Sequence, residues 1–147
     1  MRASAAWRRL SWADRTLLAE AMLLLGFASL WIAVMPFRRV ASLATRGHPA
    51  PSPATAALVR RIRWAVDACA RRSPWRAVCF QQGLAAHMML RRRGFESALF
   101  YGARRDETGE LAAHVWVRSG GEDVIGCETA SSYGLLAVFG ANRQGDL

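Results

Sequence analysis

The chain has 147 residues, of which 52% are apolar, so it is long enough for one compact domain and too apolar for global disorder. All 20 basic residues are arginines, against 11 acidic residues, and the formal net charge is +9. This surplus either attracts an acidic partner, such as nucleic acid, anionic lipid or an acidic peptide, or forms a solvated arginine-rich surface.

The cysteine and motif content argues against several kinds of site. Cys69, Cys79 and Cys127 are an odd number of cysteines without a CxxC pair, which is unlike a disulfide scaffold or a zinc knuckle. HExxH, P-loop and GxGxxG patterns are absent, and the histidines are scattered. We therefore expect neither a metal nor a cofactor, and we expect reduced thiols in a cytoplasmic protein.

Residues 12–35 are expected to form a long apolar helix. Ser11 suits the N-cap, Asp14 suits the first turn, and Pro36 ends the helix. The uncharged stretch is at the lower limit of length for crossing a bilayer. A helix buried in the core or against a partner is the favoured interpretation, and membrane-surface or spanning contact through residues 12–36 stays open. A signal peptide is disfavoured, because no small-residue cleavage site follows.

Glycine and proline punctuation divides the chain into four parts. These are the N-terminal helix with its flanks (1–46), a linker (47–53), a core region (54–140) and a frayed tail (141–147).

Two further helices are expected, at residues 54–71 and 77–93. Cys69 lies on the apolar stripe of the first and is expected to pack as a small buried side chain. Three arginines near the end of the second suit the helix dipole, and Gly94 suits its C-cap. His87 lies within this helix and is expected to be packed or solvated.

Strands are expected at residues 97–101, 111–117 and 123–128, with a turn at the Gly120-Gly121 pair. Helices followed by an antiparallel meander predict an α+β domain.

Cys79 and His114 form the strongest candidate site. Cys79 opens the third helix, where unpaired N–H groups and the helix dipole favour a thiolate. His114 lies in the second strand and is the candidate general base and acid for a Cys79 nucleophile. The backbone N–H of Cys79, with Gln82 or Trp75, could stabilise an oxyanion. A packed thiol and a structural histidine remain the plainer alternatives.

A third group should hold the imidazole in one tautomer. A three-residue loop at 119–121 would pair His114 with Gly126 and make Glu128 its diagonal neighbour on the same face. A two-residue loop would put Asp123 on the His114 face, but far along the strand. Glu128 is therefore the better candidate.

Three segments carry a resemblance to a known family. They are the cysteine helix at 79–94, which ends in Arg-Arg-Arg-Gly, the Leu-Phe-Tyr-Gly run at 99–102, and Ala-His-Val-Trp-Val at 113–117. The apolar first helix, ending in Pro-Phe-Arg-Arg at 36–39, is also similar. Over residues 10–128 the chain resembles the lasso-peptide leader peptidases, the B proteins of the transglutaminase-like cysteine protease superfamily.

The resemblance implies a transglutaminase- or papain-like core with a Cys-His-Asp triad that cuts the leader from a ribosomally made lasso-peptide precursor. Cys79 would be the nucleophile and His114 the base. The acid of the family falls near position 126, which is glycine here, so Glu128 or a water-held dyad would substitute. The implied partners are the precursor peptide, a small leader-binding protein as recognition element, and a separate macrolactam cyclase.

Other functions stay open. The same cysteine and histidine with an amine acceptor would make an acyltransferase or transglutaminase. A non-enzymatic peptide- or membrane-associated module would use the apolar helix and the arginine surface. Nucleic acid is not expected as a partner, because the arginines are not interleaved with a recognisable binding motif.

Overall fold

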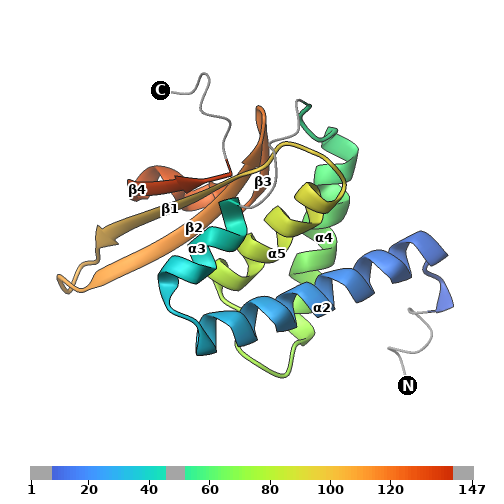
Figure 1. Ribbon diagram of the computed structural model, residues 1–147, viewed down its shortest axis with the longest axis horizontal. Coiled ribbons are helices and arrows are strands. Elements are labelled where there is room, and N and C mark those ends of the chain that lie inside the picture. Colours follow the sequence, from blue (N-terminus) through green and yellow to red (C-terminus); the bar gives the residue numbers. More distant parts are fainter. Residues whose placement is uncertain (1–7, 46–51, 141–147) are drawn as a thin grey trace.

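In a computed structural model, which describes residues 8–45 and 52–140, a helical layer covers one face of an antiparallel sheet (Figure 1). Its helices are α2 (Trp12–Val34), α3 (Phe37–Thr45), α4 (Ala56–Arg72) and α5 (Cys79–Arg92). Its strands are β1 (Ala98–Arg105), β2 (Leu111–Ser119), β3 (Glu122–Ile125) and β4 (Gly134–Phe139), and the short 3-10 helix η1 (Cys127–Ser132) precedes β4. The α+β prediction is confirmed.

α2 begins and ends where the sequence predicts. The Ser11 hydroxyl accepts a hydrogen bond from the Asp14 backbone N–H at 3.1 Å, and the helix ends before Pro36. The helix is long and apolar enough to cross a membrane, a test that core helices of soluble proteins also pass. In the structure one face, including Leu25 and Ala28, is buried against α4 and α5, while Leu23 on the other face is exposed.

α4 and α5 also lie where they are predicted. Thr55 caps α4 by accepting from the Leu58 N–H, and Cys69 is buried on its inner face. Gly94 follows α5 with a φ of 75°, as a C-terminal glycine cap requires. α3 was not predicted from the sequence, because it follows directly on Pro36, which marks the end of the preceding helix. Val40 and Ala44 bury one face of α3 in the core.

α5 is the central helix and joins the two layers (Figure 1). It contacts β2 on one side and α2 and α4 on the other. Gly83 allows the close approach to the sheet, because a Cβ there would lie 2.6 Å from Cγ1 of Val115. The start of α5 is thereby held against β2, the strand that carries His114.

The strand order in the sheet is β3-β2-β1-β4, with all neighbours antiparallel. β4, an edge strand that pairs with β1, was not predicted from the sequence. Of the predicted linker only residues 52 and 53 lie within the described part of the chain, and the predicted tail lies outside it.

The β2–β3 hairpin corrects the predicted register. Its tip has a two-residue loop, with Ser119 opposite Glu122, so the three-residue loop is wrong. A register shift then places Val117 opposite Ile125, where β3 ends. The prediction of a strand that continues to residue 128 is therefore also wrong. The chain leaves the sheet at Gly126, whose φ of 74° starts η1.

Candidate active site

Cys79 is the first residue of α5 and is half-buried. The N-cap residue before it, Val78, has no side chain that can cap the helix, whereas Ser11 and Thr55 cap α2 and α4. The first N–H groups of a helix have no partner within the helix. At the start of α5 no N-cap side chain accepts a hydrogen bond from these N–H groups. The Cys79 side chain lies at the same end of the helix.

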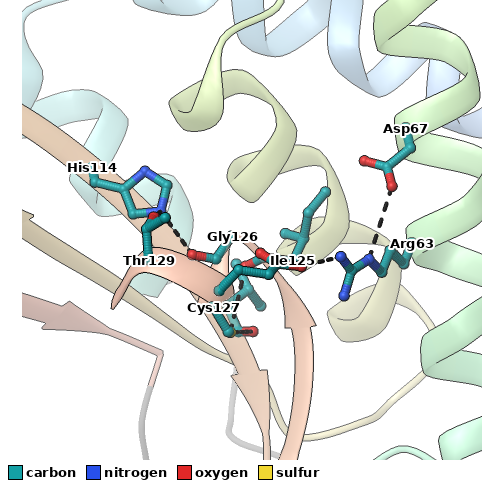
Figure 2. Close-up of polar contacts among 9 residues, drawn as sticks. Arg63, Asp67, His114, Ile125, Gly126, Cys127 and Thr129 are labelled. Carbon is teal, nitrogen blue, oxygen red and sulfur yellow. Dashed lines mark hydrogen bonds and ion pairs between the residues drawn. The ribbon is translucent and has the colours of Figure 1, made fainter. Parts of the chain in front are cut away.

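His114 is half-buried on β2, and its ring is fixed by the backbone of residue 126. Nε2 lies 2.7 Å from the Gly126 carbonyl oxygen, and the Thr129 hydroxyl oxygen lies 3.3 Å from the same nitrogen (Figure 2). A carbonyl oxygen only accepts hydrogen bonds, so Nε2 carries the proton in the neutral ring. Nδ1 has no hydrogen-bond partner among residues 8–45 and 52–140, and its lone pair is available as a base.

Aromatic side chains hold the imidazole on the sheet. The Tyr133 ring centre lies 4.9 Å from that of His114, and the Trp116 ring centre lies 6.1 Å away. The Arg104 guanidinium in turn lies 4.9 Å from the Tyr133 ring centre. These contacts were not predicted from the sequence, since Tyr133 follows η1 and reaches His114 only through the tertiary fold.

Cys79 and His114 both line two hollows on the surface. The first, which we name the apolar hollow, has a volume of about 350 Å³ and is formed by α2, α3, α5 and the sheet. The second, which we name the polar hollow, has a volume of about 210 Å³. Its other walls come from α4, α5 and the start of η1, and include Arg63, Gln82 and Glu128.

Glu128 does not lie on a strand beside His114, which corrects the predicted placement. It belongs to η1, and its carboxylate forms an ion pair with Arg63. Arg63 also lies 3.8 Å from Asp67 (Figure 2). Its own backbone N–H and the Arg63 guanidinium hold the pKa of this carboxyl below its usual value. In the described part of the chain no hydrogen bond joins Glu128 to His114.

Asp123 likewise makes no hydrogen bond to His114 in the described part of the chain, and it does not line the polar hollow. It stands opposite Arg118 in the hairpin and forms an ion pair with it at 2.8 Å. This is the position that a two-residue loop predicts.

The two oxyanion candidates lie in different surroundings. Gln82 lines the polar hollow, but its Nε2 donates to the Ala77 carbonyl oxygen at 2.8 Å. Trp75 packs against Gly26 of α2 and lines neither hollow that contains Cys79. Trp75 is therefore away from the site, whereas the backbone N–H of Cys79 and the second N–H of the Gln82 amide remain candidate donors.

The other two cysteines are packed and hydrogen-bonded. The Cys69 thiol donates to the Leu18 carbonyl oxygen, and the Cys127 thiol donates to that of Val117, each at 3.3 Å. Burial raises the pKa of both thiols, and the charge of Asp123 adds to the effect at Cys127. The expected buried position of Cys69 is confirmed.

His87 is packed in the core, which is one of the two placements, packed or solvated, expected from the sequence. Nε2 donates to the Ala44 carbonyl oxygen and Nδ1 accepts from the Ser97 hydroxyl, both at 2.8 Å. Only 1% of the residue is exposed, and burial lowers the pKa of His87 to about 4. The neutral ring ties α5 to the end of α3 and to the start of the sheet.

The fold and the site together define a class of protein, in which a helix with cysteine at its start packs on an antiparallel sheet that carries a histidine. The family model of the transglutaminase-like superfamily matches residues 21–137, so the chain belongs to that superfamily. No curated protein and no solved structure matches the chain significantly. The superfamily generally includes cysteine proteases and transglutaminases, and the match confirms this part of the sequence resemblance.

Proposed function

We propose that this chain is a cysteine peptidase that removes the leader from a ribosomally made lasso-peptide precursor. One observation carries the proposal. Cys79, at a helix start without a side-chain cap, and His114 line the same two hollows. The substrate class rests on the resemblance of residues 79–94 and 113–117 to the leader peptidases.

In the first step Nδ1 of His114 accepts the Cys79 proton. The Cys79 Sγ forms a bond to the scissile carbonyl carbon, and the negative charge moves to the carbonyl oxygen. Backbone N–H groups in the first turn of α5 donate to that oxygen. The Gly126 carbonyl keeps its hydrogen bond to Nε2 and so stabilises the positively charged imidazolium.

In the second step the carbon–nitrogen bond breaks, and Nδ1 gives its proton to the leaving amine. The leader remains on Cys79 as a thioester. His114 then takes a proton from water, whose oxygen attacks the thioester carbon, and the carbon–sulfur bond breaks as Cys79 is reprotonated. The products are a leader with a new carboxylate and a core peptide with a free amine.

We assign the third position of the site to a backbone carbonyl. A side chain at position 126 is incompatible with this geometry, because φ is 74° and a Cβ would lie 2.5 Å from the Val115 carbonyl oxygen. The Gly126 carbonyl provides the acceptor that fixes the tautomer of His114. It does so without the charge of a carboxylate.

The proposal also includes partners and a compartment. A small leader-binding protein would position the precursor by holding its remote leader, so that binding energy is used to orient the scissile bond. A macrolactam cyclase would use the amine that the peptidase frees. Precursor synthesis and reduced thiols both suit the cytoplasm.

The test is cleavage of the precursor, in the presence of the leader-binding protein, followed by mass spectrometry. The wild-type chain should give a leader and a core peptide, and it should act more slowly without the partner. Cys79→Ala should give no product, and Cys127→Ala, a matched removal of another half-buried thiol, should retain cleavage. Unchanged cleavage by Cys79→Ala would overturn the proposal. Transfer of the acyl group to an added amine, without hydrolysis, would make the chain an acyltransferase.

A further inference from the structure

The apolar hollow is built in part by the N-terminal helices, which lie outside the segments that carry Cys79 and His114. Ile32 and Met35 from the end of α2, and Phe37 and Val40 from α3, form one side of it. Phe80 and Tyr101 also line the hollow. α2 and α3 therefore help to form the surroundings of the proposed nucleophile.

Phe37 is placed at the edge of an aromatic cluster. Its ring centre lies 5.6 Å from that of Tyr101, 6.2 Å from that of Phe80 and 6.4 Å from that of Phe139. Even so, 51% of Phe37 is exposed. A phenylalanine that packs on three rings and still exposes half of its surface has an apolar face available for a ligand.

The position of α3 is held by the buried histidine. His87 donates to the Ala44 carbonyl oxygen near the end of α3, and Val40 and Ala44 pack in the core. The wall that carries Phe37 is thus anchored before any substrate binds, which lowers the entropic cost of binding.

We propose that the apolar hollow is a specificity subsite that binds one large aliphatic or aromatic side chain of the peptide, next to the scissile bond. The inference rests on the proposed peptidase function and adds the chemistry of the residue that the site selects. Cys79 and His114 belong to the walls of the hollow, so a side chain held there lies beside the reacting atoms.

Volume and charge both fit this occupant. About 350 Å³ is near the lower end of the range of about 300–1,000 Å³ for small-molecule sites, which suits one side chain with its backbone rather than a helix. Among the described residues that line the hollow there is no Asp, Glu or Arg. A charged side chain would lose its hydration there without an ionic partner.

The experiment uses simple 2-chloroacetamides on the whole chain, so it does not depend on the natural substrate. In each reagent the Cys79 Sγ displaces chloride and forms a thioether, and only the amide substituent differs. N-methyl-, N-benzyl- and N-(2-carboxyethyl)-2-chloroacetamide would be compared, with rates at Cys79 measured by peptide mass mapping. Each rate is divided by the rate of the same reagent with glutathione, which removes differences in intrinsic reactivity.

The N-benzyl reagent should label Cys79 about 10–100-fold faster than the N-methyl reagent, in line with discrimination by apolar pockets, and the carboxyethyl reagent should be the slowest. Phe37→Ser should reduce the benzyl-to-methyl ratio towards about one. Leu23→Ser removes a more exposed apolar side chain, 74% exposed on α2 and absent from the hollow, and should keep the ratio. The wild-type series alone already tests the proposal if Phe37→Ser does not fold.

Each contrary outcome has a distinct meaning. A benzyl-to-methyl ratio near one at a reactive Cys79 would overturn the subsite and leave the peptidase proposal intact. An equal loss of the ratio in Phe37→Ser and Leu23→Ser would assign the effect to general surface hydrophobicity and overturn the subsite. Protection of Cys79 by phosphatidylglycerol vesicles, but not by N-acetyl-phenylalanine amide, would assign the hollow to lipid. Labelling of Cys79 no faster than Cys69 by every reagent would overturn both proposals.

Discussion

His87 and His114 carry the same side chain, yet the fold gives them different surroundings. His87 uses both ring nitrogens in buried hydrogen bonds, to Ser97 and Ala44. His114 uses Nε2 at the Gly126 carbonyl, makes no hydrogen bond through Nδ1 within residues 8–45 and 52–140, and lines both hollows together with Cys79. The comparison teaches that a histidine can act as a base where the fold fixes one nitrogen and leaves the other unpaired.

The largest expected effect is on catalysis at His114. His114→Ala should lower kcat/KM for precursor cleavage by about 1,000-fold or more, because the proposed base and acid is lost. Its melting temperature should change little, since the residue is half-exposed. The measurements are cleavage kinetics and thermal unfolding on the same samples. Cleavage near the wild-type rate would show that His114 is a structural residue.

The next effect is on stability at His87. His87→Ala should lower the free energy of unfolding by about 2–4 kcal/mol, because it leaves a cavity and two buried polar groups without a partner. Urea unfolding measures this change. In a double-mutant cycle with Ser97→Ala, the two losses should be less than additive, since both variants break the same hydrogen bond. Fully additive losses would contradict the geometry at Nδ1.

A third effect is the dependence of stability on pH. The pKa of His87 falls from the ordinary 6.5 to about 4 in the folded chain, so below pH 6.5 the unfolded state binds the proton first. Stability should therefore fall as the pH drops from about 6.5 towards 4, by up to about 3 kcal/mol. His87→Ala should flatten the curve in this window. Urea unfolding at several pH values checks it, and an unchanged slope in the variant would contradict the assignment.

The smallest effect is expected from Glu128 and Asp123, the two acidic residues that the sequence offers as partners of His114. Glu128→Gln should change kcat/KM by no more than about threefold, because its carboxylate pairs with Arg63 and the Gly126 carbonyl holds the imidazole. Asp123→Asn, paired with Arg118 in the hairpin, is the matched control and should also stay near the wild-type rate. A loss of about 100-fold or more in Glu128→Gln alone would restore Glu128 as the orienting acid.

Local signals in the chain determined most of the helices. Ser11 and Pro36 bound α2, and Gly94 follows α5, because caps and breakers act within one turn of the helix. The strand-like runs at residues 97–101 and 111–117 likewise indicated β1 and β2. These elements could be predicted because their causes lie within a few residues of their effects.

The candidate pair of Cys79 and His114 was also visible in the sequence, as a cysteine at a helix start followed by a strand histidine. Tertiary structure decided what surrounds them. β4 forms by pairing with the distant β1, and the register shift in the β2–β3 hairpin moves Glu128 off the sheet. The Gly126 carbonyl and the wall of the apolar hollow arise only when segments far apart in the chain pack together. No local pattern records such contacts, because their energy comes from partners that are remote in sequence.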